Sequence, residues 1–263
     1  DVAAVRADLP QHPGLPERAA AGQYSSSNAP ARWVTARLNR RTWSIIACSI
    51  FSDYSQRMHQ TTAVIRPYRA SDHADVYDVC VRTADVGGDA RGKYHSDDLM
   101  PDLFAGPYVF LEPEFAFVLD DGQRAVGYVI GTPDTAAFAR AYRARWIPHL
   151  AGRYEVPPDP PTSPDEAMVA LHHRPERLVR PGLEAYPAHL HIDLLPPFQG
   201  AGHGRAMMET FYAAAAQAGA SGVHVTVTTA NTRAIGFYLR LGFREMTLAE
   251  PGETTVTYLG RAL

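Results

Sequence analysis

The stretch HIDLLPPFQGAGHGRAMM, residues 191–208, constrains the fold more than any other part of the sequence. An apolar run, 188–195, predicts a β-strand that ends in two prolines, and three glycines follow within five positions. Residues 203–218 then carry apolar side chains at helical spacing, with Gly219 as a C-terminal stop. Because the first N–H groups of a helix have no acceptor inside it, this strand, turn and helix start predict an anion-binding site.

The flanking segments predict a mixed α/β sheet with helices on both faces. The expected strands are 63–69, 222–229 and 254–263, together with a hairpin over 114–132 that turns at Asp121-Gly122. The expected helices cover 71–84 with Ser71 as N-cap, 96–104, 134–148, roughly 163–172, and 231–242 with Asn231 as N-cap.

The N-terminal quarter of the chain has a different composition. Residues 1–57 are rich in Ala, Arg, Pro and Ser and show weak periodicity, and Met58 begins a segment that resembles the start of a folded domain. We therefore expect an N-terminal extension over 1–57 and one domain over 58–263. Proline-rich VPPDPPTSPDE indicates an irregular insertion at about 133–185.

Composition excludes several classes of protein. The net charge of −3 gives no basic field for nucleic acid or an anionic membrane, and the two cysteines have no CxxC spacing. The apolar run after NRRTW is too short to span a bilayer and lacks a small-x-small cleavage site. The histidines of LHHRPER form no metal constellation. We expect a cytoplasmic protein without a bound metal.

Three nucleotide-binding patterns compete for the glycine loop. The dinucleotide fingerprint needs GxGxxG and an acidic residue about 20 residues later, and the P-loop needs GxxxxGK[ST]; neither is present. The third pattern, Q-x-x-G-x-G/A, fits Gln199-Gly200-Ala201-Gly202-His203-Gly204. Taken alone, three close glycines also fit a simple tight turn.

A second motif, NTRAIGFYLRLGF, begins at Asn231, 27 residues after Gly204. Together the two motifs resemble the GNAT superfamily of acetyl-CoA-dependent N-acyltransferases, over roughly residues 63–263. The segments 127–154 and 189–208 also resemble the acetyltransferase-like domain of O-GlcNAcase. The resemblance implies the GNAT fold, a mostly antiparallel sheet of about seven strands, and acetyl-CoA as co-substrate.

The resemblance also implies the residues that bind the co-substrate. The loop cradles the CoA pyrophosphate, the main chain of Ile192 and Leu194 faces the acetyl-pantetheine arm, and the Tyr238 hydroxyl protonates the departing thiolate. The full expected set is Ile192, Leu194, Leu195, Gln199, Gly200, Ala201, Gly202, His203, Gly204, Arg205, Asn231, Phe237 and Tyr238.

Attack by an amine requires a proton acceptor, since an alkylammonium group has a pKa near 10. Asp193 is the best-placed carboxylate, with His191 and His189 as alternatives and a water chain as a rival. Period-two alternation raises a difficulty, because Asp193 points away from the side chains of Ile192 and Leu194. A purely structural role for Asp193, pairing with a neighbouring helix, also stays open.

The acceptor is expected to be a primary amine on a small molecule or peptide. Segments 87–98 and 146–154 are candidates to bind it, with Tyr94, Trp146 and Asp193 as contacts, although core packing also accounts for the aromatic residues. No cysteine lies near either motif, which favours direct transfer over a covalent intermediate. An acetyl-CoA sensor and a peptide-binding module without transferase activity are the competing functions. A monomer or a homodimer is expected.

Overall fold

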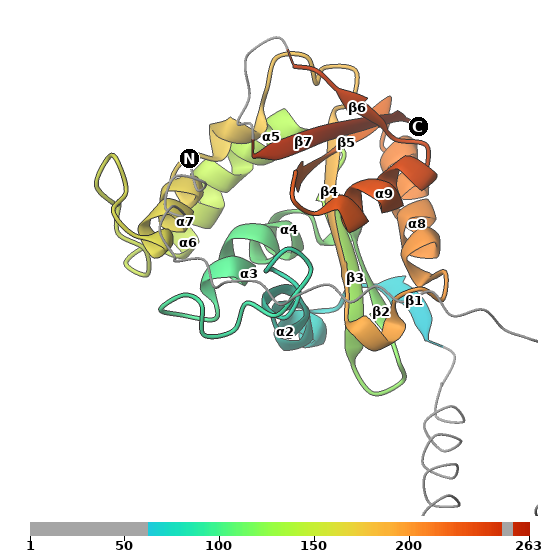
Figure 1. Cartoon of the computed structure of the whole chain (residues 1–263), viewed down its shortest axis with the longest axis horizontal. Helices are drawn as coiled ribbons and strands as arrows, with labels where there is room; N and C mark the ends of the chain where they lie inside the picture. Colours follow the sequence, from blue (N-terminus) through green and yellow to red (C-terminus); the bar gives the residue numbers. More distant parts are fainter. Residues whose placement is uncertain (1–62, 249–254) are drawn as a thin grey trace, which may run out of the picture. The chain divides into compact units, whose positions relative to one another are not determined.

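The computed structural model describes residues 63–248 and 255–263, so the predictions for residues 1–57 and Met58 lie outside the described residues. Seven strands form one sheet in the order β1-β2-β3-β4-β5-β7-β6 (Figure 1). Among the described strands, β4 and β5 pair in parallel and every other neighbouring pair is antiparallel. The predicted mostly antiparallel sheet is therefore confirmed.

The strands are β1 Val64–Pro67, β2 Ala116–Asp120, β3 Ala125–Thr132, β4 Ala188–Leu194, β5 Gly222–Thr228, β6 Arg244–Met246 and β7 Val256–Ala262. The helices are α2 His73–Val81, α3 Leu99–Phe104, α4 Gly106–Leu111, α5 Thr135–Ala141, α6 Ile147–His149, α7 Pro164–His172, α8 His203–Gln217 and α9 Thr232–Arg240. One π-helical segment, Tyr142–Trp146, joins α5 to α6.

Most predicted boundaries agree with the structure because turn chemistry sets them. Gly122 in the hairpin and Gly219 after α8 both have φ near +92°, a conformation that glycine adopts without steric cost. The N-cap prediction for Ser71 is wrong: Ser71 lies inside a short 3₁₀ turn, Ala70–Asp72, and α2 begins at His73. Helix α4 was not predicted, because almost all of it is buried and it has no amphipathic period.

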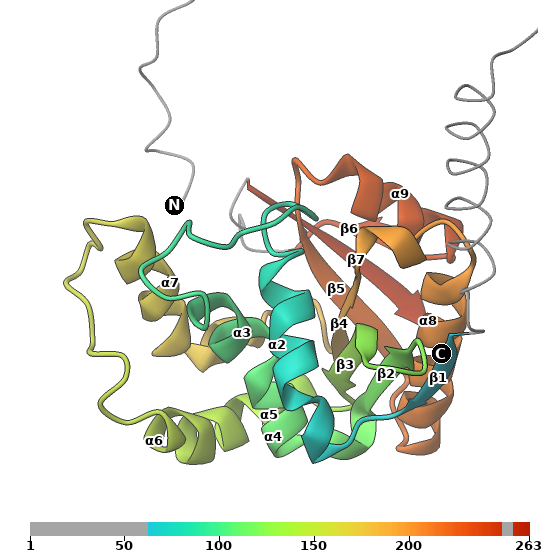
Figure 2. The ribbon, with the colours of Figure 1, turned by 90° about the horizontal axis from the view of Figure 1, so that it is seen from below.

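Helices cover both faces of the sheet, with α2, α3 and α4 on one side and α8 on the other (Figure 2). On β3, a side chain at Gly131 would meet the ring of Phe211 on α8 at 2.7 Å. Tyr128, on the opposite face of β3, lies among side chains of α2. The side chains of odd-numbered β4 residues share the face of Tyr128, as the Tyr128–Asp193 hydrogen bond shows.

Strand β4 separates from β5 toward its C-terminal end but stays paired with β3. It pairs with β3 from His189 to Leu194 but with β5 only at Ala188 and His189. No described helix is long and apolar enough to cross a membrane.

Candidate active site

The open edge of β4 exposes backbone groups. The N–H of Leu195 donates to the carbonyl of Val126, 2.9 Å away, so odd-numbered residues there direct their backbone toward β3. By alternation, the backbone groups of Ile192 and Leu194 point toward β5, which has already diverged. The alternation difficulty therefore disappears, because Ile192 presents an N–H within the sheet plane while the Asp193 side chain rises from one face.

The glycine loop beside this edge holds a run of unused donors. Gly200 and Gly202 have φ of +80° and +91°, and Gly202 is the N-cap of α8 without any side-chain cap. The backbone N–H groups from Gly200 to Arg205 donate to no acceptor within the described residues, and the first helical bond runs from Ala206 to Gly202 at 3.2 Å. Six successive free donors at a helix start match the phosphate site that the sequence predicts.

Gln199 joins the loop to the strand. Its Nε2 donates to the carbonyl oxygen of Leu194 at 2.7 Å, so the free N–H groups begin immediately beside the open end of β4. Leu195 is buried, His203 is half-buried and Arg205 is exposed. The structure thus brings together the loop and strand residues that the sequence assigned to one site.

Helix α9 packs against the start of α8. Asn231 caps it, with Oδ1 accepting the N–H of Ala234 at 3.0 Å, and the Asn231 Nδ2 has no partner in the described chain. A side chain at Gly204 would lie 3.3 Å from the ring of Phe237, so a glycine lets α8 approach α9 closely there. Phe237 packs against the core as well as against this glycine.

Asp193 lies on the face of the sheet covered by α2. Its Oδ2 accepts a hydrogen bond from the Tyr128 hydroxyl at 2.6 Å. Burial raises the pKa of the Asp193 carboxyl, and the hydrogen bond from Tyr128 partly opposes that shift. Buried Cys80 adjoins Tyr128.

Tyr238 is 7% exposed and remains protonated under ordinary conditions. Burial raises the pKa of its phenol above the usual value of 10, and the negative charge of Asp193 raises this pKa further. No hydrogen bond of its hydroxyl to any described residue is present. The Tyr238 hydroxyl is therefore a free proton donor within the electrostatic reach of Asp193.

The sequence analysis missed the tyrosines that hold the β4 side chains. Tyr128 comes from β3 and Tyr108 from α4, and they bond to residues that lie 65 and at least 81 positions away. Tyr128 stands on the predicted hairpin, and strand pairing in the right register would have found it. Tyr108 lies in the helix that the pattern did not predict.

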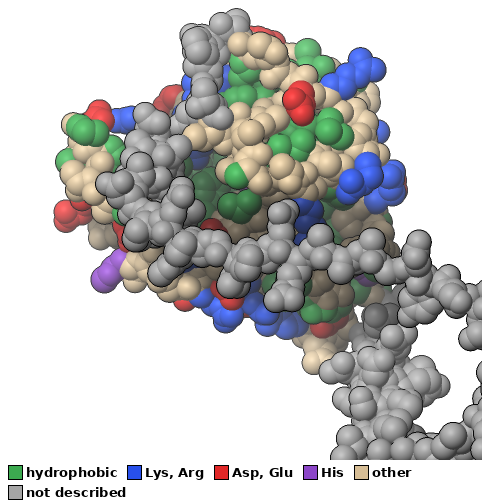
Figure 3. Space-filling model, viewed as in Figure 1, with side chains coloured by type: hydrophobic (Ala, Val, Ile, Leu, Met, Phe, Trp, Pro, Cys, Tyr) green, Lys and Arg blue, Asp and Glu red, His purple; other side chains and the backbone are tan. Residues whose placement is uncertain are grey.

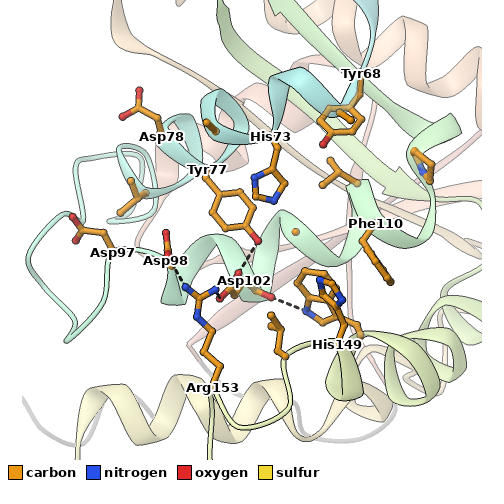
Figure 4. Close-up of a pocket in the computed structure, with 18 of the residues that line it drawn as sticks. Tyr68, His73, Tyr77, Asp78, Asp97, Asp98, Asp102, Phe110, His149 and Arg153 are labelled. Atoms are coloured by element: carbon orange, nitrogen blue, oxygen red, sulfur yellow. Dashed lines mark hydrogen bonds and ion pairs between the residues drawn. The ribbon is translucent and has the colours of Figure 1, made fainter.

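The predicted acceptor residues lie in two places. Trp146 is 3% exposed, donates from Nε1 to the Asp102 carbonyl at 2.9 Å, and lines a pocket of about 970 Å³ together with Asp97 and Asp98 (Figure 4). Tyr94 does not line this pocket; it packs with Tyr154 against the buried cluster around Leu99 and Met168. No residue of β4, α8 or α9 lines the pocket.

The pocket lies between two walls that carry aromatic rings. Tyr68, His73 and Tyr77 stand on one side, and Phe110 and His149 on the other (Figure 4). The Trp146 ring contacts those of both Phe110 and His149. At its acidic end the Asp102 carboxylate accepts hydrogen bonds from Tyr77, Tyr154 and Arg153. Four aspartates and two arginines line the pocket. Arg153 pairs with Asp98 and Asp102, and Asp78 pairs with Arg82 and Arg124, so Asp97 is the lining carboxylate without an ion pair among the described residues.

Charged side chains of both signs are visible on the face drawn in Figure 3. On the face in Figure 3, basic and acidic side chains are interspersed among neutral ones, in keeping with the net charge of −3. Among residues 63–248 and 255–263, no group of three His, Cys, Asp or Glu side chains is arranged to hold a metal ion.

Known proteins resemble this chain over its described part. The acetyltransferase (GNAT) family matches residues 167–243. The crystal structure of SsHAT is 57% identical, covers 76% of this chain and 97% of its own, and has a TM-score of 0.72.

Two curated relatives are much longer. Protein O-GlcNAcase of Rattus norvegicus is 27% identical over 201 residues, and that of Mus musculus is 28% identical over 202 residues. Each match covers 76% of this chain and 22% of the relative, so the chain spans about a fifth of the length of these proteins. The family match, the near-complete coverage of SsHAT and the seven-stranded fold agree: the chain belongs to the GNAT acetyltransferase family.

Proposed function

We propose that this protein is an acetyl-CoA-dependent N-acetyltransferase that moves the acetyl group directly to a primary amine. The observation that carries the proposal is the run of six free N–H groups from Gly200 to Arg205 beside the open end of β4. These donors fit a pyrophosphate, and the pairing of β4 with β5 stops at His189, which leaves the backbone groups of Ile192 and Leu194 without a described partner strand and open to pairing with the pantetheine arm.

Each remaining requirement of acyl transfer has a candidate in the same place. The Ile192 N–H points into the gap and can donate to the oxyanion that forms on the thioester carbonyl. The free Tyr238 hydroxyl can protonate the leaving sulfur. Asp193 lies on the face from which an amine would approach, together with His191.

The state of Cys80 supports direct transfer over a covalent intermediate. Cys80 is 3% exposed, and burial raises the pKa of its thiol far above the usual value. A thiol that stays protonated is a poor nucleophile. The amine then attacks the thioester while both substrates are bound.

We propose that the pocket beside Trp146 binds the cationic part of the acceptor. Asp97, which has no ion pair within the described residues, suits an amine, and the aromatic walls suit a cation placed against a ring. Phe110, 38% exposed in this wall, gives the test. Phe110→Ala should raise the KM for the acceptor and leave the KM for acetyl-CoA unchanged, whereas Val156→Ala, at a position 76% exposed and outside the pocket, should change neither. Tyr94, which packs against the cluster around Leu99 and Met168, is assigned a supporting role.

The cytoplasmic location, the monomeric or homodimeric state, and the division into an extension over 1–57, a domain over 58–263 and an insertion at about 133–185 are also proposals. Fractionation, light scattering and limited proteolysis would test them.

An acceptor screen tests the function itself. The protein is incubated with acetyl-CoA and a panel of small-molecule and peptide amines, free CoA thiol is measured, and mass spectrometry identifies the product. The proposal requires one acetyl group on nitrogen for each thiol released. Tight binding of acetyl-CoA with no turnover on any amine would instead support a sensor, and absence of binding would support a peptide-binding module.

A further inference from the structure

A chain of hydrogen bonds runs beneath β4 and ends at His191. Its members are Thr135 at the start of α5, His189, Tyr108 on α4 and His191. Thr135, His189 and Tyr108 are at most 6% exposed, while His191 is half-buried. Tyr108 is packed between rings, stacked on Phe138 at 4.4 Å and in edge contact with both histidines.

The direction of every bond in this chain follows from its inner end. The Thr135 hydroxyl donates to the Pro187 carbonyl at 2.7 Å, so its oxygen must accept from His189 Nδ1, also 2.7 Å away. Burial lowers the pKa of His189 and keeps the ring neutral, which leaves Nε2 as an acceptor. Tyr108 therefore donates its hydroxyl proton to His189 Nε2 across 2.7 Å.

These assignments also fix the direction of the last hydrogen bond, between Tyr108 and His191. Since the Tyr108 proton is used by His189, the Tyr108 oxygen accepts from His191 Nε2, 3.2 Å away. The neutral His191 ring then carries its proton on Nε2 and its lone pair on Nδ1. Nδ1 of His191 has no partner among the residues that the structure describes.

Asp193 is placed differently. Its Oδ2 is already engaged by the Tyr128 hydroxyl, 2.6 Å away. His191 lies two residues earlier on the same face, and its Nδ1 has no hydrogen-bond partner among the described residues. His191 adjoins Ile192, whose N–H points toward the side on which β5 has diverged from β4. His191 therefore has a ring nitrogen without a hydrogen-bond partner among the described residues, whereas Asp193 Oδ2 already accepts the hydrogen bond from Tyr128.

We propose that His191 Nδ1, and not Asp193, takes the proton from the attacking amine, and that Tyr108, His189 and Thr135 are positioning residues that hold His191 in the required tautomer. This inference rests on the proposed function. The ammonium group first releases one proton to water, and the neutral amine nitrogen then bonds to the thioester carbon. A second proton passes from this nitrogen to His191 Nδ1, the carbon–sulfur bond breaks, and Tyr238 protonates the sulfur. His191 and Tyr238 then return to their starting states by proton exchange with water.

The charge around His191 suits a transient base. Burial first, and then the positive charge of Arg177, lowers the pKa of His191 to about 4, so the ring is neutral when the amine arrives. The groups that face it are Tyr108 from α4, Arg177 from the segment Pro175–Leu178, and His189 and Asp193 from its own strand. Attack makes the amine nitrogen strongly acidic, so a weak base suffices to take its proton.

The structure provides a matched control for the chain. Tyr142 is 4% exposed, packs edge-on against the same Phe138, and bonds to another buried histidine, with 2.9 Å between its hydroxyl and His172 Nδ1. Tyr108→Phe and Tyr142→Phe therefore remove the same atom from similar surroundings. Only the first disconnects His191.

The test combines histidine NMR with kinetics. Long-range ¹H–¹⁵N spectra of the wild-type protein should show His189 protonated on Nδ1 and His191 on Nε2. Tyr108→Phe should give His191 a mixture of tautomers and lower kcat about tenfold, with the KM for acetyl-CoA unchanged. Tyr142→Phe should leave the His191 signals and kcat unchanged. His191→Gln should lower kcat about a hundredfold, and more than Asp193→Asn does.

Three results would overturn the inference. These are a wild-type His191 protonated on Nδ1, a His191→Gln variant with undiminished kcat, and an Asp193→Asn variant that loses more activity than His191→Gln. A protein that acetylates amines and tolerates His191→Gln overturns this inference alone. A wild-type protein that turns over no amine removes the proton-accepting role together with the proposed function, and the NMR result then decides the fixed tautomer by itself.

Discussion

Helices α7 and α8 differ in how the N–H groups of their first turns, which have no acceptor within the helix, are satisfied. At α7 the Ser163 hydroxyl accepts the Glu166 N–H, and the Glu166 carboxylate accepts from Thr162, so nearby side chains close that end. At α8 the N-cap is Gly202, and no described residue caps the helix with a side chain or accepts a hydrogen bond from the N–H groups of residues 200–205. A start that local side chains could have closed, but that glycines leave open, is available to an anionic ligand.

The largest effect is expected from a negative charge at the open start. Gly202→Asp should weaken acetyl-CoA binding at least about a hundredfold, because the carboxylate occupies the phosphate site. Gly219→Asp is the matched control: both glycines have φ near +91° and open space around a new Cβ, but Gly219 follows the far end of α8. Calorimetry should show loss of binding for the first variant and normal binding for the second. Equal loss in both would mean that backbone strain, and not charge, is responsible.

Low pH should destabilise the protein through His172, the last residue of α7. Burial lowers the pKa of His172 to about 4, below the value of about 6.5 in an unfolded chain. Between pH 6.5 and pH 4 this histidine is protonated in the unfolded state and neutral in the folded state. The free energy of unfolding is therefore highest above pH 6.5 and decreases as the pH falls toward 4. We expect a loss on the order of 2 kcal/mol from this group.

Urea unfolding at pH 7 and pH 5 measures this loss. His172→Gln should make the decline shallower without abolishing it, because burial also lowers the pKa of His189 and His224. An unchanged slope would remove His172 from the account.

The start of α9 has a side-chain cap and also an available donor. Asn231 caps the helix with Oδ1, and its Nδ2 has no partner among the described residues. Asn231→Asp keeps an N-cap acceptor, so the melting temperature should change little, but it exchanges a donor for a negative charge. Acetyl-CoA binding should weaken about tenfold, or about 1.4 kcal/mol. Asn231→Ala should weaken binding and also lower stability. Wild-type affinity in Asn231→Asp would exclude a contact between Asn231 and the co-substrate.

The smallest effect is expected at the closed start. Ser163→Ala should destabilise the protein by about 1 kcal/mol, because the Glu166 N–H loses its acceptor. Thermal unfolding measures the loss, and the affinity for acetyl-CoA should not change. Weaker binding in this variant would show that the two helix starts are coupled, contrary to the comparison.

The sequence predicted what local chemistry determines. The loop Gln199–Gly204, the Asn231 cap and the ends of α8 and α9 each depend on residues within a few positions of one another. The partners of Asp193 and His191 could not be predicted in this way, because strand register and an unpredicted helix bring them from 65 and 83 residues away. The choice between the two side chains as base depends on those distant hydroxyl groups.

The sharpest test of the open helix start follows the backbone amides themselves. Coenzyme A is titrated into ¹⁵N-labelled protein, and the amide signals of residues 200–205 are followed beside those of 164–166 at the start of α7. The account predicts large downfield proton shifts for the first group, as free N–H groups begin to donate to phosphate, and unchanged signals for the second. Saturable binding that leaves the amides of 200–205 unmoved would contradict it.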